Sequence, residues 1–351
     1  MDLAELWVLF ADTQCAAYSP LYDRIARCVA TSDELLALVQ AAPGQAHMPN
    51  VLLAAVHYLL LAGADDPLAA VYEGASTADA GPMFVDFALR HRDEVAQLLA
   101  TRHTNTNEVG RSAVVAPALT FVADRLGSPL GLVDVGCSAG LNLLCDGYRI
   151  DYGSAGATGP ADAAVRLTCE VIGGAPPIAA SVPPIAARVG IDRDPVDLRN
   201  DDDVRWQLAC VWPDTGRLPR SRLAFEQARG ADLRIVRGDA VDALADVVSS
   251  LPEECVPVVL TTWALAYLSP ERRLAFEAAL TGLGRDRPVA WISGEGPGVV
   301  PSFAGVEVPA DAPGVTASIL GLVVFAGSAG EPTLLGFVHN HGSWLDWRAD
   351  A

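Results

Sequence analysis

An apolar run that ends at an acid and continues into a glycine-containing turn is the feature that most constrains this chain. Residues 132–142 read LVDVGCSAGLN, which predicts a buried strand ending near Asp134 and a helix beginning beyond Gly140. Glycine lets the backbone turn tightly and approach a ligand, and the first N–H groups of a helix have no partner within it. The pattern is typical of a nucleotide-like cofactor site, and a plain strand-to-helix connection would have the same sequence.

Three later segments have a similar design, in which an apolar run ends at an acid or at polar residues. In an open parallel sheet, ligands bind outside the carboxyl ends of the strands, so we expect these ends to converge on one crevice. Asp192 is expected to accept hydrogen bonds from ribose hydroxyls and Asp239 from an exocyclic amine, with Ala240 leaving room for a flat ring. Each acid alone is equally typical of a helix N-cap or a turn. The segments are residues 186–192, 233–239 and 256–263.

These segments resemble the successive cofactor motifs of class I S-adenosylmethionine-dependent methyltransferases, from about Leu130 to the end of the chain. The acid and glycines of the first motif correspond to Asp134, Gly136 and Gly140, with a serine in place of the central glycine. Residues 190–195 are similar to the second motif, and residues 238–240 to the third. The resemblance implies S-adenosylmethionine as the cofactor. The implied binding residues are Asn107, Glu108, Arg111, Asp134, Gly136, Ser138, Gly140, Asn142, Asp192, Asp239, Ala240 and Thr261.

More narrowly, the chain resembles an uncharacterised bacterial family built on this fold. The likeness rests on residues 106–111, 138–144 and 203–206 and spans nearly the whole chain. It implies the fold and no particular reaction.

The segment before the first motif is a candidate contact for the amino-acid end of the cofactor. In class I methyltransferases the preceding segment commonly covers that end. We expect Arg111 to pair with the carboxylate in a bidentate fork and Glu108 to accept from the amine, with Asn107 beside them. A helix-capping acid and a surface arginine would have the same sequence.

The first hundred residues read differently from the rest, with helical periodicity at 3–15, 20–29, 33–39, 51–61 and 84–99. We predict a helical cap at residues 1–105 and a methyltransferase-like domain at 106–351, which a helix at 112–126 leads into. The domain carries an insertion at about 148–184, with one strand-like run at 165–171. If the insertion displaces Asp192, Asp194 is the alternative ribose acid.

The last third of the chain predicts how the sheet ends. Residues 288–293 read as a further parallel strand, and 317–325 and 333–339 as a hairpin. The predicted fold class is therefore α/β, a Rossmann-like, mostly parallel sheet ending in an antiparallel hairpin, with an N-terminal helical cap. Such closure resembles the methyltransferase fold, and the G-x-G-x-x-G fingerprint of nicotinamide dehydrogenases is absent.

Candidate catalytic residues follow the later strands. His339 and His341 lie near the end of the hairpin, and an imidazole with a near-neutral pKa is a suitable base. Tyr267 follows the fourth strand, where Trp263 could add an apolar wall, and Glu295 ends the fifth. Structural histidines and core aromatics would show the same pattern.

Composition excludes several classes of function. The formal net charge of −19 argues against nucleic acid or an anionic membrane as the main partner. All 24 basic residues are arginines, which excludes pyridoxal Schiff-base chemistry and a Walker-type phosphate loop. The seven cysteines are irregularly spaced, so neither a metal site nor a disulfide framework is expected. With no basic leader and no bilayer-length apolar run, we expect a cytoplasmic protein.

Together these features predict an S-adenosylmethionine-dependent methyltransferase acting on a small molecule, with the cap controlling access to the crevice. One alternative is a cofactor-binding or catalytically degenerate relative that acts through protein contacts, because no base is unambiguous. A nicotinamide-dependent oxidoreductase is the other, disfavoured by the glycine spacing. The substrate, the acceptor atom and the oligomeric state stay open.

Overall fold

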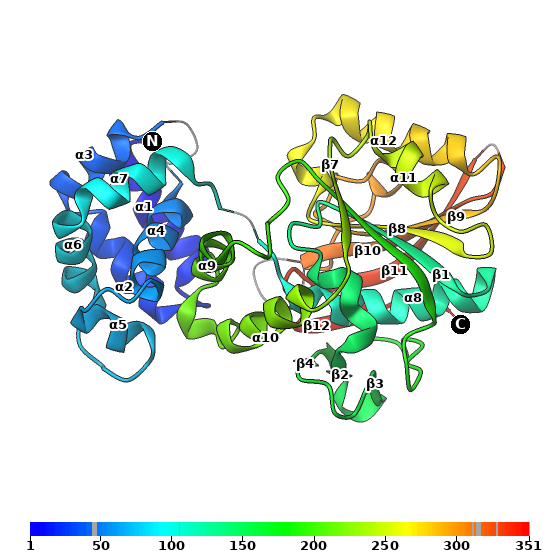
Figure 1. The fold of residues 1–351 in the computed structure, drawn as a ribbon, viewed down its shortest axis with the longest axis horizontal. Coiled ribbons are helices and arrows are strands. Elements are labelled where there is room, and N and C mark those ends of the chain that lie inside the picture. The colour runs from blue at the N-terminus through cyan, green and yellow to red at the C-terminus, as the bar shows by residue number, and fades with distance from the viewer. Residues whose placement is uncertain (44–47, 105, 311, 314–316, 328, 351) are drawn as a thin grey trace. The chain divides into compact units, whose positions relative to one another are not determined.

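Two units of different architecture make up the computed structural model, which describes all residues except 44–47, 105, 311, 314–316, 328 and 351 (Figure 1). The first unit comprises Met1–Thr106 and Asp197–Arg222, and the second comprises Asn107–Val196 and Leu223–Ala351. The sequence predicts residues 197–222 to lie with the sheet, whereas their contacts are with the N-terminal helices. Asn105, inside the predicted junction, lies outside the described residues.

The first unit is helical, and short polar side chains begin most of its helices. Ser19, Ser32, Asp66 and Asp79 each accept a hydrogen bond from a backbone N–H in the first helical turn. The run predicted at 84–99 is two helices that meet at His91. No helix in the described parts of the chain is long and apolar enough to cross a bilayer. The elements are α1 (Leu3–Phe10), a π-helix (Ala11–Cys15), α2 (Pro20–Val29), α3 (Asp33–Ala41), α4 (Pro49–Leu61), α5 (Pro67–Tyr72), α6 (Ala80–Arg90), α7 (Arg92–Thr101), α9 (Asp201–Ala209), η6 (Pro213–Thr215) and the start of α10 (Leu218–Arg229).

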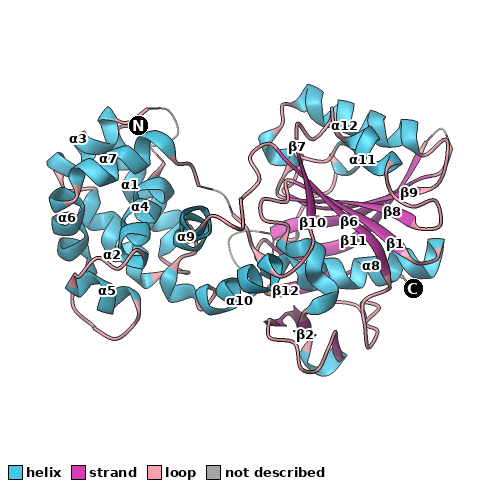
Figure 2. Ribbon diagram, in the orientation of Figure 1, coloured by secondary structure: helices cyan, strands magenta, loops and turns pink. Residues whose placement is uncertain are grey.

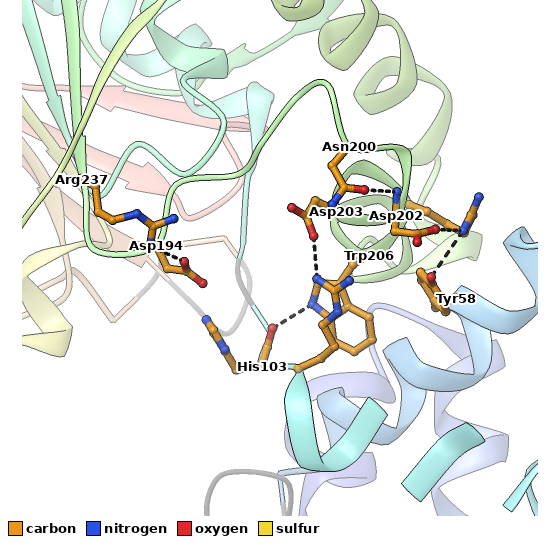
Figure 3. Close-up of polar contacts among 10 residues, drawn as sticks. Tyr58, His103, Asp194, Asn200, Asp202, Asp203, Trp206 and Arg237 are labelled. Atoms are coloured by element: carbon orange, nitrogen blue, oxygen red, sulfur yellow. Dashed lines mark hydrogen bonds and ion pairs between the residues drawn. The ribbon is translucent and has the colours of Figure 1, made fainter. Parts of the chain in front are cut away.

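Helix α9 is joined to this unit by side chains from one of the motifs that carry the family resemblance. The indole Nε1 of Trp206 donates to the carbonyl O of His103 at 2.9 Å, and Arg102 pairs with Asp203 at 2.8 Å (Figure 3). The Arg102 guanidinium also lies over the Trp206 ring, 5.8 Å from its centroid. The motif at 203–206 therefore holds a helix to the segment that follows α7.

The second unit contains a nine-stranded sheet in the order β5-β12-β11-β10-β9-β8-β1-β6-β7. Five neighbouring strands, from the edge strand β7 through β6, β1 and β8 to β9, are parallel. Strand β10 is antiparallel to β9, and β10 and β11 form the predicted hairpin. The predicted fold class is confirmed. The strands are β1 (Leu130–Val135), β5 (Glu170–Val171), β6 (Ile185–Asp192), β7 (Arg234–Arg237), β8 (Val256–Thr262), β9 (Val289–Glu295), β10 (Ala317–Phe325), β11 (Gly330–His339) and β12 (Trp344–Trp347).

Helices cover both faces of this sheet. Helices α11 (Leu244–Ser249) and α12 (Pro270–Leu283) lie on one face, and α8 (Ser112–Leu126) lies on the other (Figure 2). On the α12 side, Phe276 packs edge-on against Trp291, with 5.5 Å between ring centroids. Every residue of β1 is buried, as expected of a parallel strand covered on both faces. The core therefore fixes the positions of the strand ends.

The insertion predicted at about 148–184 divides between two sheets. Its run at 165–171 is interrupted at Cys169, whose N–H donates to the carbonyl O of Asp151. Residues before this point pair in a small sheet of β2 (Arg149–Asp151), β3 (Ala157–Thr158) and β4 (Arg166–Thr168). Residues after it form β5, which pairs with β12 at the edge of the large sheet. One predicted strand is therefore two, because the chain changes partner midway.

Replacing Gly336 with alanine is expected to destabilise the second unit, because the added Cβ would overlap the carbonyl O of Asp346 in β12. Gly336 also has a φ of +154°. We expect a loss of about 3 kcal/mol in the free energy of unfolding, measured by urea denaturation. The control is Gly282→Ala in α12, where the Cβ meets nothing within 4 Å. It should raise stability by up to about 1 kcal/mol, and equal effects of the two substitutions would contradict the close approach at Gly336.

Candidate functional site

The site lies where the order of the parallel strands reverses. From β1 the chain builds β6 and β7 on one side and then crosses to β8 and β9 on the other. In open α/β sheets the crevice outside such a switch point is the usual ligand site. The turns after β1 and β8 meet there, since a Cβ built on Gly136 would lie 2.7 Å from the Cβ of Ala264.

The turn after β1 exposes one glycine within an otherwise buried stretch. Gly136, Ser138 and Gly140 all have left-handed backbones, with φ values of 74°, 52° and 74°. Gly136 is exposed, whereas every other residue from 130 to 145 is buried. The turn leads into a short 3₁₀ helix, η4 (Leu141–Gly147), and the predicted α-helix start is not formed. The turn therefore exposes the backbone of Gly136. It leads into a 3₁₀ helix, so it does not present the N-terminus of an α-helix.

The glycine at position 136 is already required by the fold. Its left-handed φ and the proximity of Ala264 exclude a larger side chain without movement of the turn. Loss of ligand binding in a Gly136→Val variant would therefore report on the turn as well as on a ligand contact.

Asp192 ties the end of β6 to this turn. One carboxylate oxygen accepts from the N–H of Ser138 and the other from the N–H of Asp194, both at 2.8 Å. The Asp194 carboxylate instead pairs with Arg237 at 2.7 Å (Figure 3). Of the two acids proposed to bind a ribose, Asp192 is therefore the one at the turn.

The third predicted acid, Asp239, is engaged by arginines. Arg193 pairs with it at 2.7 Å, Arg272 contacts its other oxygen, and the N–H of Val241 donates to it at 2.9 Å. Burial acts to raise the pKa of Asp239, but these hydrogen bonds outweigh it and lower the pKa to about 2. Ala240 is partly buried and packs against the core. The Asp239 carboxylate thus already has protein partners.

Arg111 is a buried cation that binds two main-chain carbonyls. Its Nη1 donates to the carbonyl O of Thr262 at 2.7 Å and its Nε to that of Asn340 at 3.1 Å. Its Nη2 makes no hydrogen bond with the described residues. Burial lowers the pKa of Arg111, and the nearby groups of Glu108, Glu295, Tyr267 and Asp134 oppose this. The arginine therefore keeps one donor group that the described residues do not use.

Residues beside Arg111 hold the start of α8. Glu108 caps the 3₁₀ turn η3 (Val109–Arg111) by accepting from the N–H of Gly110 at 2.8 Å. Asn142 accepts from the hydroxyl of Ser112, the first residue of α8, at 2.8 Å. The buried Nδ2 of Asn107 has no partner among the described residues. Glu108 and Asn142 thus have structural contacts, whereas the Asn107 amide keeps an unused donor.

Asp134 is a buried carboxyl that makes no hydrogen bond with any described residue. It lies at the end of β1 and is 3% exposed. Burial raises the pKa of Asp134 to about 7, while Arg111 acts to lower it and Asp192 to raise it further. Asp134 has no hydrogen-bond partner among the described residues and interacts electrostatically with an arginine that has an unused donor, an arrangement that a ligand with both charges would complete.

Glu295, predicted to be catalytic, is fully buried and binds backbone N–H groups. Its Oε1 accepts from Ala264 at 2.9 Å and from Leu265 at 3.1 Å, whereas its buried Oε2 has no partner among the described residues. Burial raises the pKa of Glu295. Thr261, predicted to bind cofactor, is also fully buried, and its hydroxyl accepts from the indole of Trp291 at 2.9 Å. Both side chains thus have contacts inside the protein.

The other candidate catalytic residues lie in the turn after β8 and at the end of β11. Tyr267 is 78% exposed in the turn after β8. His339 Nδ1 accepts from the N–H of His341 at 3.1 Å, and their ring centroids are 5.4 Å apart. The intervening Asn340 accepts from Arg111, so the structure brings this turn to the same site.

Trp263 is a strained residue that the predicted binding set omits. Its φ is 57°, and it and Ser138 are the non-glycine residues with positive φ in the described chain. Such a conformation costs of the order of 1–3 kcal/mol and is concentrated at functional sites. The Trp263 indole donates to Ser318 at 2.6 Å, and Ser318 donates to the side chain of Asn340 at 2.9 Å. The sequence gives no signal of this positive φ, because tryptophan disfavours the left-handed conformation.

The raised pKa of Asp134 predicts how stability depends on pH. Between its ordinary value of 3.8 and about 7, the folded state keeps a proton that the unfolded state has lost, so stability falls as pH rises through this window. The difference corresponds to about 4 kcal/mol at most. Asp134→Asn cannot ionise and should be more stable than the wild type at pH 8 but not at pH 4, by urea denaturation. The exposed Asp124→Asn in α8 is the control, and a wild-type-like pH slope in the Asp134 variant would contradict the burial effect.

Comparison with known proteins identifies a family for this chain. The model of a family described as uncharacterized proteins conserved in bacteria (DUF2332) matches residues 4–347. No curated protein matches the chain. The match covers both units and all the residues of the site, and it agrees with the narrower resemblance predicted from three motifs. The chain therefore belongs to the DUF2332 family of bacterial proteins.

Proposed function

We propose that the site at the carboxyl edge of the sheet binds S-adenosylmethionine and that the protein is a methyltransferase acting on a small molecule. The observation that carries this proposal is the pair formed by Arg111 and Asp134. A buried guanidinium with an unused donor and a buried carboxyl without a partner complement the carboxylate and ammonium of an α-amino acid. The exposed backbone of Gly136 follows β1, the strand that contains Asp134.

The neighbouring residues fit a nucleoside joined to that amino acid. Asp192 accepts one hydrogen bond at each oxygen, and a carboxylate has about four acceptor positions, so two remain for ribose hydroxyls. Asp239 fits less well, because two arginines already occupy its oxygens. We therefore assign the amino-acid end to Arg111 and Asp134 and the ribose to Asp192, and we assign no role to Asp239.

Bound S-adenosylmethionine supplies an electrophilic methyl group on a sulfonium. The chain would contribute orientation, since the acceptor must lie in line with that methyl group, and a base where the acceptor carries a proton. His339 and His341 lie on the turn that Arg111 contacts, and they are the proposed base candidates. We assign no proton transfer to Glu295, because its Oε1 already accepts hydrogen bonds from the N–H groups of Ala264 and Leu265.

A second candidate function is cofactor binding without catalysis. It is favoured by the contacts of Glu295, which remove one of the four predicted catalytic residues, and by the 78% exposure of Tyr267. In that case the same ligand would bind without turnover.

Calorimetric titration tests the proposal, with S-adenosylhomocysteine, S-adenosylmethionine and NADPH as separate ligands. We expect the first two to bind with one site per chain and NADPH to give no heat. Asp192→Ala should weaken binding of S-adenosylhomocysteine tenfold or more, since a hydrogen bond to a charged group contributes about 1.5–3 kcal/mol.

The control is Asp242→Ala, an exposed acid whose partner is Arg272. It should leave the affinity unchanged. Binding of NADPH without S-adenosylhomocysteine would replace the proposal with the oxidoreductase alternative. No heat with any of the three ligands would reject a site of this class.

A further inference from the structure

Two unfavourable features occur in and against the turn that follows β8, which we call the β8 turn and define as residues 263–267. Trp263 begins it with a positive φ, and Glu295 lies fully buried against it with one oxygen unpartnered. Neither feature stabilises the fold by itself, because a left-handed tryptophan and a buried unpartnered carboxylate oxygen are each disfavoured. Both persist only where neighbouring contacts hold them in place.

The β8 turn is held at both its N–H groups and its carbonyl groups. On one side Glu295 accepts from the N–H groups of Ala264 and Leu265. On the other side Arg273 of α12 donates to the carbonyl O of Leu265 at 2.9 Å and to that of Ala266 at 3.0 Å. The position of the turn is therefore set by one buried acid on β9 and one arginine on α12.

The held turn and the strand end before it contact two parts of the proposed cofactor site, the glycine turn and Arg111. Ala264 lies against Gly136, so a shift of the β8 turn changes the space at the exposed glycine. Thr262, the last residue of β8, accepts from Arg111 through its carbonyl O, so the same shift moves the guanidinium. The Trp263 indole continues through Ser318 to Asn340, the second acceptor of Arg111.

We propose that Glu295 is a positioning residue of the cofactor site, which acts by holding the β8 turn against the glycine turn and Arg111. This inference rests on the proposed function, because it assigns a role within that site. Glu295 does not itself contact the ligand, and its effect on affinity passes through Ala264 and Thr262. The role differs from the acid–base role predicted from the sequence.

The test compares three variants by melting temperature and by calorimetric affinity for S-adenosylhomocysteine. Glu295→Ala removes the acceptor and should weaken binding at least tenfold while lowering the melting temperature. Glu295→Gln keeps an acceptor oxygen and should restore the affinity to within threefold of the wild type. The matched control is Glu277→Ala in α12, because Glu277 also has one buried, unpartnered oxygen while its other oxygen accepts from Ser302. It should lower the melting temperature and leave the affinity unchanged.

The outcomes separate this inference from the proposed function. No binding to the wild type overturns the proposed function and this inference with it. Binding to the wild type with equal affinity in a folded Glu295→Ala variant overturns the inference alone. An equal loss in Glu295→Gln would show that charge and not the held turn matters, and would also overturn it. If Glu295→Ala does not fold, Arg273→Ala frees the other side of the turn and should weaken binding at least threefold, and unchanged affinity there contradicts the role.

Discussion

A buried guanidinium bonded to main-chain carbonyls is the interaction on which the candidate site of the second unit depends. Arg111 lies just before α8 and donates to the end of β8 and to the turn between β11 and β12. Placing a cation in the interior is unfavourable unless hydrogen bonds and negative groups surround it. The acids Asp134, Glu108 and Glu295 supply that negative potential. One residue thus ties together the start of α8, the end of β8 and the turn after β11.

Most of the sheet was predictable because its inner strands read as apolar runs, as expected of strands buried on both faces. Residues 256–260 and 319–325 read as runs of apolar residues and glycine, without a polar residue between them. Helix α8 begins and ends as predicted, at Ser112 and Leu126. These signals are local and therefore visible in the sequence. The placement of α9 is decided by Trp206 and Asp203 reaching a segment about a hundred residues earlier, which no local pattern contains.

The common edge of the strand-end residues was predictable from the sequence, but the contacts of their side chains were less so. The acids that end β1 and β6 lie at one edge of the sheet, because the carboxyl ends of parallel strands meet there. Whether an acid is available depends on cations that arrive from elsewhere in the chain. Arg272, from the start of α12, reaches Asp239, whereas no such arginine hydrogen-bonds to Asp134. An aspartate therefore forms ion pairs after β7, at Asp239, and has no hydrogen-bond partner among the described residues in β1, at Asp134.

The discontinuous first unit has a consequence for synthesis on the ribosome. Trp206 packs with Ala54 and Ala55, and Asp214 accepts from the Ser19 hydroxyl and the Leu21 N–H. Domains generally fold in the order in which they emerge, the N-terminal one first. Here the helices of the first hundred residues leave the ribosome well before the residues that complete their packing. Strands β1 and β6 of the other unit emerge in between, so the nascent helical unit stays unfinished until about residue 222 has been translated.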